Sequence, residues 1–217
     1  MAVISRPAVT CRPNDLHVLE TERLWIVTSR ATDYVRWLRI AVDDPESAPD
    51  WPEHVVAQAR QVAIGSVADP VDASQPGLPV DPDWLFLAGV HRETRELVSS
   101  LSVFSRNRAS EIGGSVRYGY RGQGYGHETL VAACALAHRH FGIARLVAGA
   151  EPSNTASRRW LAGAGFTSAT GPPRVKLGNG RTIEALWWEH VDRDAELRCS
   201  RPRPHFRRGL LRTLARR

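Results

Sequence analysis

The sequence RGQGYG, residues 121–126, joins a β-rich segment to an apolar helical segment and decides how the chain is interpreted. Gly122, Gly124 and Gly126 carry no side chain, so their backbone N–H groups can turn toward one point. The helix that follows directs the positive end of its dipole to the same point. The loop therefore predicts an anion site that suits a pyrophosphate. The structural alternative is a turn that only starts a helix.

Two common phosphate-binding motifs do not match this loop. A Walker loop would continue into Gly-Lys-Ser or Gly-Lys-Thr, and the only lysine of the chain is Lys176. The spacing of the glycines also departs from the dinucleotide fingerprint. The sequence therefore excludes both of these nucleotide-binding classes.

The segments on either side of the loop predict one mixed α/β domain. Upstream, apolar β-rich segments indicate strands at 18–28, 84–90, 97–104 and 111–116, and short helices are predicted at 32–42 and 52–64. Downstream, the pattern predicts a helix of about 15 residues, a strand at 144–150, a helix at 155–162 and a hairpin of 174–177 with 182–188. Strands and helices that mix in this order are typical of an α/β (α+β) fold.

Three motifs in the same order give the chain a resemblance to the GCN5-related N-acetyltransferases, over about residues 18–191. The signature (Q/R)xxGx(G/A) is met by Arg121, Gly124 and Gly126. The pattern NxxS followed by GF is met by residues 154–157 and 165–166. The opening LETERL, residues 19–24, resembles the RimJ/RimL-type subgroup that acetylates the N-termini of ribosomal proteins.

This resemblance implies a central mixed, mostly antiparallel sheet that is splayed between its fourth and fifth strands and flanked by helices. Here those strands are 111–116 and 144–150. The implied domain is 18–191, with an irregular segment at 1–17, a Pro/Asp-rich loop at 68–83 and an Arg-rich tail at 192–217.

The resemblance also implies acetyl-CoA as the acyl donor. Its pantetheine arm would lie in the splayed opening as an additional strand. The implied contacts are the backbones of Ser115 and Val116 and the side chain of Asn154 for pantetheine, the amides of Gln123, Gly124, Gly126 and His127 for the pyrophosphate, and Arg121, Arg158 or Arg159 for CoA phosphates. A capping role in the next helix is the structural alternative for Asn154.

Amide formation requires a neutral amine, so a carboxylate near the thioester should accept a proton from the acceptor. Glu111 is the first candidate and Glu151 the second, and which of them acts stays open. The alternative for Glu111 is a solvent-facing residue at the start of an edge strand. Many family members protonate the leaving sulfur with a tyrosine seven residues after the motif asparagine. Leu161 stands there, so the proton must come from Ser157, from water or from elsewhere. Ser157 is the candidate that could donate a hydrogen bond to the sulfur.

The net charge of +6 resides in the C-terminal tail, because residues 197–217 contain eight arginines and no acidic residue. Residues 1–196 therefore sum to −2. A nucleic-acid or membrane contact is conceivable only through residues 198–217, where leucines alternate with arginines at helical spacing. A non-catalytic CoA-binding protein that acts through this tail is the alternative function.

The remaining expectations concern partners, metals and location. The acceptor is an amine of a protein or peptide N-terminus or of a small molecule, and a homodimer is left open. No metal site is expected, because His138 and His140 point apart on a helix and the three cysteines form no CxxC pair. The longest apolar run, residues 130–137, is too short to span a membrane, and we expect a cytoplasmic location.

Overall fold

The computed structural model describes most of the predicted domain. The described residues are 9–12, 16–29, 42–45, 53–60, 85–106, 109–176, 181–196 and 198. The predicted helix 32–42, apart from Val42, the Pro/Asp-rich loop 68–83 and the tail beyond 198 lie outside these ranges. In the described part of the chain, no helix is long and apolar enough to cross a membrane.

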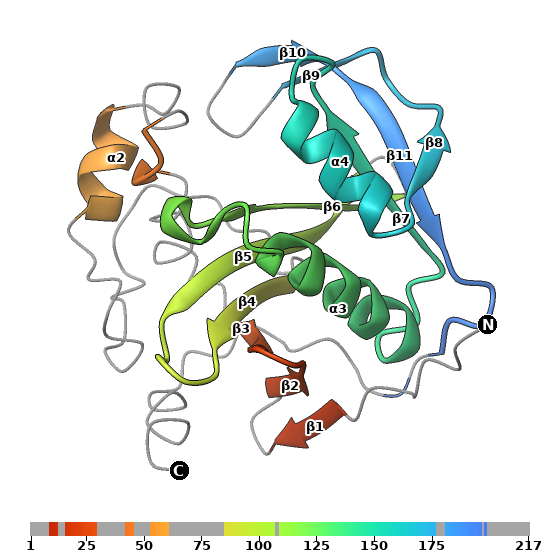
Figure 1. The fold of residues 1–217 in the computed structure, drawn as a ribbon. Coiled ribbons are helices and arrows are strands. Elements are labelled where there is room, and N and C mark those ends of the chain that lie inside the picture. Colours follow the sequence, from red (N-terminus) through yellow and green to blue (C-terminus); the bar gives the residue numbers. More distant parts are fainter. Residues whose placement is uncertain are drawn as a thin grey trace.

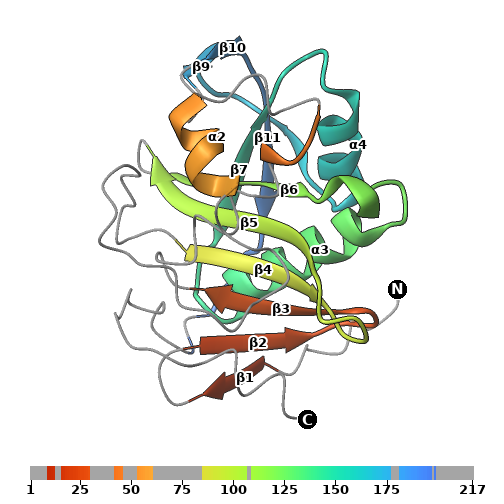
Figure 2. The ribbon, with the colours of Figure 1, turned by 90° about the vertical axis from the view of Figure 1, so that its left-hand side faces the viewer.

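The first half of the domain is a run of antiparallel strands (Figure 2). Its members are β1 (Val9–Arg12), β2 (Leu16–Glu20), β3 (Leu24–Ser29), β4 (Leu85–His91), β5 (Leu97–Arg106) and β6 (Ala109–Val116). Each strand pairs with the next one in the chain. The hairpin of β4 and β5 is confirmed. The short helix predicted at 52–64 is found as α2 (Glu53–Arg60).

The prediction of a single strand over 18–28 is wrong, because residues 21–23 form a tight turn between β2 and β3. Thr21 N–H donates to Leu24 O at 2.9 Å, and Leu24 N–H donates to the Thr21 hydroxyl oxygen at 3.0 Å. The turn contains neither glycine nor proline, so the β-forming residues around it concealed the break. The segment expected to be irregular, 1–17, also contributes β1 and the start of β2.

The second half of the sheet adds β7 (Arg145–Ala150), β11 (Leu186–Val191) and β8 (Thr167–Ala169). The strand order is β1-β2-β3-β4-β5-β6-β7-β11-β8, and only β6 and β7 are parallel among the described strands. This confirms the mixed, mostly antiparallel sheet.

The predicted strand 182–188 is wrong because it is two strands. Its first part, β10 (Thr182–Glu184), pairs with β9 (Arg174–Lys176) in a separate hairpin. Ala185 N–H then bonds Pro173 O at 3.0 Å, and the chain passes into β11 of the main sheet. Trp187 of β11 packs in one cluster with Val147 of β7 and with Val175 and Ile183 of the hairpin, so the hairpin lies against the main sheet.

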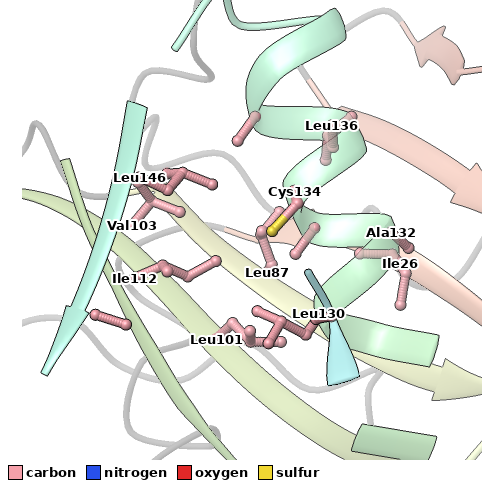
Figure 3. Close-up of a cluster of buried hydrophobic side chains, with 14 of the residues drawn as sticks. Ile26, Leu87, Leu101, Val103, Ile112, Leu130, Ala132, Cys134, Leu136 and Leu146 are labelled. Carbon is pink, nitrogen blue, oxygen red and sulfur yellow. The ribbon is translucent and has the colours of Figure 1, made fainter. Parts of the chain in front are cut away.

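Two helices cover one side of the sheet, α3 (Tyr125–Arg139) and α4 (Thr155–Gly163) (Figure 1). The apolar residues of α3 enter the main core, where Leu130, Cys134 and Leu136 meet Leu87 and Leu146 from the strands (Figure 3). Burial raises the pKa of the Cys134 thiol to about 12, so this cysteine is a core residue and not a nucleophile. Packing of α3 against the sheet fixes where its N-terminus, and hence the glycine loop, lies.

Candidate active site

The sheet opens between β6 and β7. These strands pair only at Ser110 with Leu146 and at Glu111 with Val147. Beyond Glu111, β6 continues along β5 to Val116, and β7 continues along β11 to Ala150. The two strands therefore part (Figure 1), as the splay predicted for 111–116 and 144–150 requires.

The backbone N–H and C=O groups of Val116 point into the opening, whereas those of Ser115 point to the neighbouring strand β5. Arg117 N–H donates to Val98 O at 2.8 Å, which identifies this pair as hydrogen-bonded. Backbone groups alternate along an antiparallel strand, so those of Ser115 point to β5 and those of Val116 point away from it. Arg121 Nε donates to Val116 O at 3.1 Å. The Val116 N–H is therefore the better placed of the two predicted backbone contacts.

The glycine loop ends in a helix start that has no side-chain cap among the described residues. Gly122 and Gly124 have φ values of +74° and +83°, in the left-handed region that favours glycine. Gly124 is the N-cap of α3, so the first-turn amides of Tyr125, Gly126 and His127 lack the usual side-chain acceptor. Such amides and the helix dipole together attract an anion.

The start of α3 is held against its neighbours at Gly126. A Cβ on this glycine would lie 3.1 Å from Val116 Cγ2 and 3.3 Å from Trp160 Nε1. The same indole nitrogen donates to Gly126 O at 2.6 Å. Gly126 thus lets α3 begin close to both β6 and α4, which places the predicted pyrophosphate site beside the opening.

The guanidinium group of Arg121 is bonded to other parts of the protein and is not a freely exposed phosphate ligand. Its Nη2 forms an ion pair with Asp44, a carboxylate that is only 1 % exposed, while its Nε bonds the end of β6. These contacts connect the loop to residues 42–45. The phosphate role of Arg121 stays a prediction, and the exposed Arg158 and Arg159 lie in the first half of α4.

Glu111 occupies the last paired position before the strands part. Its side chain is half-buried and projects from the face opposite to that of the buried Ile112. β6 lies between β5 and β7, so the alternative of an edge strand is wrong. Glu151 follows β7 directly, and its Oε2 accepts from Arg181 Nη2 at 3.0 Å. Both carboxylates thus flank the opening, and Glu151 is engaged in an ion pair.

The first turn of α4 carries the NxxS motif. Asn154 is the N-cap, and its Oδ1 accepts from Ser157 N–H at 2.9 Å, which confirms the capping alternative. Ser157 is half-buried in that turn. Leu161 is 4 % exposed and packs in the main core, so no hydroxyl stands where many relatives have a tyrosine.

Sequence reasoning missed a polar cluster beneath the glycine loop. Glu128, in the first turn of α3, accepts hydrogen bonds from Thr21 Oγ1 at 2.6 Å, Arg23 N at 2.8 Å and Arg23 Nε at 2.8 Å. Burial alone would raise the pKa of Glu128, but these hydrogen bonds and the Arg23 charge outweigh it and lower the pKa. The LETERL segment contains Thr21 and Arg23, yet nothing in it indicated a partner 105 residues away.

His138, near the end of α3, and His140, the C-cap of this helix, have separate partners. His138 Nε2 lies 2.9 Å from His190 Nδ1, whereas the His140 ring packs against His17 with centroids 4.6 Å apart. Within the ranges that the structure describes, no group of three or more His, Cys, Asp or Glu side chains could hold a metal ion.

Comparisons with known proteins identify the family. Residues 23–167, two thirds of the chain, match the family described as acetyltransferase (GNAT) domain. No curated protein sequence matches the chain.

Solved structures share the fold. RimL, a ribosomal L7/L12 alpha-N-protein acetyltransferase in complex with coenzyme A, is 18 % identical over 81 % of this chain and 97 % of its own, with a TM-score of 0.56. The ribosomal-protein-S5-alanine acetyltransferase from Vibrio fischeri is 13 % identical over 82 % and 98 %, with a TM-score of 0.54. The microcin C7 self-immunity acetyltransferase MccE, in complex with acetyl-CoA and AMP, is 14 % identical over 84 % and 98 %, with a TM-score of 0.54. With the family match over two thirds of the sequence, the chain belongs to the GNAT acetyltransferase family.

Proposed function

We propose that this enzyme transfers the acetyl group of acetyl-CoA to a primary amine in the opening between β6 and β7, by direct attack in a ternary complex. The observation that carries the proposal is the two-residue pairing of β6 with β7, next to a glycine loop that starts an uncapped helix. A thioester with a long polar arm and a pyrophosphate matches both features, since the arm can bond the open strand and the pyrophosphate the helix start.

The donor would lie along β6 with its pyrophosphate on the glycine loop. Val116 N–H faces the opening and would bond the pantetheine arm or the thioester carbonyl. The amides of Gln123, Gly124, Gly126 and His127 would hold the pyrophosphate. The cap uses Asn154 Oδ1, which leaves its Nδ2 as the donor for a pantetheine carbonyl. The complexes of RimL with coenzyme A and of MccE with acetyl-CoA support this choice of donor.

The reaction needs one proton acceptor and one proton donor. The amine attacks the thioester carbonyl, and Glu111 takes its proton directly or through a water molecule. The tetrahedral intermediate, stabilised at its oxygen by a backbone N–H of β6, collapses with cleavage of the C–S bond. Ser157 donates a hydrogen bond to the departing sulfur, which is finally protonated by water. We place Glu111 before Glu151 as the base, because Glu111 occupies the last paired position before β6 and β7 part, next to where the thioester would lie.

The acceptor is proposed to be the α-amino group of a protein or peptide. This rests on the LETERL resemblance and on the likeness to ribosomal-protein acetyltransferases. A small-molecule amine is the second option within the same chemistry. A cytoplasmic location, a homodimer and nucleic-acid or membrane contacts through 198–217 stay predictions from the sequence.

The test is acceptor-dependent release of free CoA from acetyl-CoA, measured with a thiol reagent and a panel of peptides and small amines. We expect Glu111→Gln to lower kcat about 100-fold and Ser157→Ala to lower it about tenfold. Glu189→Gln is the matched control, because Glu189 is also half-buried but lies on β11, beside Arg145 at the closed end of β7. Release that needs no acceptor, or equal activity in Glu111→Gln and Glu189→Gln, would contradict the proposal.

A further inference from the structure

Arg23 lies in the turn between β2 and β3, and its guanidinium group reaches the glycine loop from beneath. Its Nη1 donates to Gln123 O at 2.9 Å, and its Nε bonds Glu128 Oε2 at 2.8 Å. The guanidinium carbon lies 4.1 Å from the centroid of the Tyr125 ring. A Cβ on Gly124 would lie 3.3 Å from Arg23 Nη2. One side chain thus contacts the glycine loop and two residues in the first turn of α3, Tyr125 and Glu128.

The bond to Gln123 O determines where the next amide points. The peptide bond between Gln123 and Gly124 is trans and planar, so the C=O of Gln123 and the N–H of Gly124 point in opposite directions. Arg23 holds the carbonyl on its own side of the loop. The Gly124 N–H is therefore directed to the other side, away from Arg23.

The bond to Glu128 controls the charge at the start of α3. Glu128 is the acidic residue of the first helical turn, and its side chain is 14 % exposed. An uncompensated carboxylate there would repel an anion bound at the same helix start. Arg23 supplies the opposite charge and two of the hydrogen bonds that Glu128 accepts.

We propose that Arg23 is a positioning residue for the donor pyrophosphate, which it does not itself need to touch. It orients the Gly124 amide toward the anion and neutralises Glu128, so the loop is ready before the donor binds. This inference rests on the proposed function, because it assumes that a pyrophosphate-bearing thioester occupies the loop.

The test compares two acetyl donors that differ in the pyrophosphate. Acetyl-CoA carries it, whereas acetyl-pantetheine has the same reactive thioester and arm without the nucleotide. With the best acceptor of the panel, we expect Arg23→Ala to raise KM for acetyl-CoA about tenfold with kcat within about twofold. The kcat/KM for acetyl-pantetheine should stay within about twofold of the wild type, because that donor does not use the loop.

Three further variants separate positioning from simple loss of an ion pair. Arg23→Lys should recover only part of the KM, because an ammonium group cannot hold Gln123 O and Glu128 together in a planar fork. Arg23→Ala combined with Glu128→Gln should recover the part that comes from charge. Arg145→Ala removes an ion pair of the same kind, Arg145 Nε to Glu189 Oε2 at 2.6 Å. It should leave the kinetic constants for both acetyl donors unchanged.

Two results would overturn the inference. An equal loss with both donors would show a general structural role, and an unchanged KM for acetyl-CoA in Arg23→Ala would show no role at the loop. A wild type that fails to bind acetyl-CoA would instead contradict the proposed function, and the inference with it. Binding of acetyl-CoA to the wild type, measured by calorimetry, distinguishes these cases.

Discussion

The antiparallel half of the sheet and the β6–β7 junction use the same backbone groups in opposite ways. β4 and β5 pair from Leu85 with Val103 to Val90 with Leu97, and β5 and β6 pair along all of β6. β6 and β7 share only two pairs. A complete ladder consumes its N–H and C=O groups internally, whereas a ladder that stops early leaves them for a ligand. The difference shows that the candidate site depends on backbone groups that the β6–β7 ladder leaves unpaired.

In the paired strands of the antiparallel half, added side-chain volume should lower the free energy of unfolding more than it does at the β6–β7 junction. The largest effect is expected at Gly114 of β6. A Cβ at Gly114 would lie 2.2 Å from Ser100 O and 2.8 Å from Leu101 Cα, both backbone atoms of β5. We expect Gly114→Ala to lower the free energy of unfolding by about 3 kcal/mol. Gly113→Ala is the matched control, since nothing lies within 4 Å of its Cβ position. Denaturant unfolding of both variants decides the matter, and equal stabilities would contradict the close approach of β5 and β6.

In the glycine loop beside the β6–β7 junction, a substitution by alanine should act through the backbone conformation. At Gly124 the φ of +83° is unfavourable for any residue with a Cβ, so Gly124→Ala should cost about 1–2 kcal/mol of stability. Its amide would also turn from the pyrophosphate, and affinity for acetyl-CoA should fall about tenfold. Gly122→Ala is the matched control, because Gly122 has a similar φ of +74° and nothing lies within 4 Å of its Cβ position. We expect both variants to lose stability but only Gly124→Ala to lose affinity for acetyl-CoA. That result would show that the loss of affinity comes from the Gly124 amide and not from backbone strain.

Histidines at the C-terminal end of α3 and on β11 make the stability of the protein sensitive to acid. Burial lowers the pKa of His138, and the charges of His190 and Arg139 act in the same direction, while the bond to Ile143 O and the charge of Asp192 oppose it. Burial lowers the pKa of His140 and His190 as well. The unfolded chain therefore binds more protons than the folded chain as the pH falls through the ordinary histidine range, so the free energy of unfolding should fall as the pH drops from 7.5 to 5.5.

Chemical denaturation at several pH values measures this slope. His190→Gln removes one titrating group and the hydrogen bond to His138, and it should flatten the dependence. A wild type as stable at pH 5.5 as at pH 7.5 would show that these histidines titrate normally in the folded protein.

The smallest expected effect separates the two roles of Asn154. Asn154→Ala loses the cap of α4 and should cost about 1 kcal/mol of stability. Asn154→Asp keeps the cap acceptor but loses Nδ2, so it should retain stability and bind acetyl-CoA more weakly. Thermal unfolding with calorimetry compares the two variants. Full acetyl-CoA affinity in Asn154→Asp would leave capping as the only role of this residue.

The sequence predicted the parts of the site that depend on neighbouring residues. The glycine loop, the start of α3 and the NxxS turn of α4 are local features, and all three lie where they were expected. The contacts between Arg23 and Glu128 and between Arg121 and Asp44 join residues 105 and 77 positions apart, and no local pattern indicates them. The turn at 21–23 and the break at Ala185 were missed because backbone hydrogen bonds override β-propensity there. The bond at the turn is local, from Thr21 N–H to Leu24 O, whereas Ala185 N–H bonds Pro173 O, 12 positions away.

Backbone amide exchange followed by NMR, with and without acetyl-CoA, tests the central claim most directly. We expect acetyl-CoA to slow exchange at the N–H groups of Val116, Gly124 and Gly126, which face the opening or the helix start. Amides in the complete ladder of β3 and β4, such as those of Val27 and Leu87, should exchange at unchanged rates. Binding of acetyl-CoA without protection at Val116 and the loop would contradict the account, because the donor would then occupy another part of the molecule.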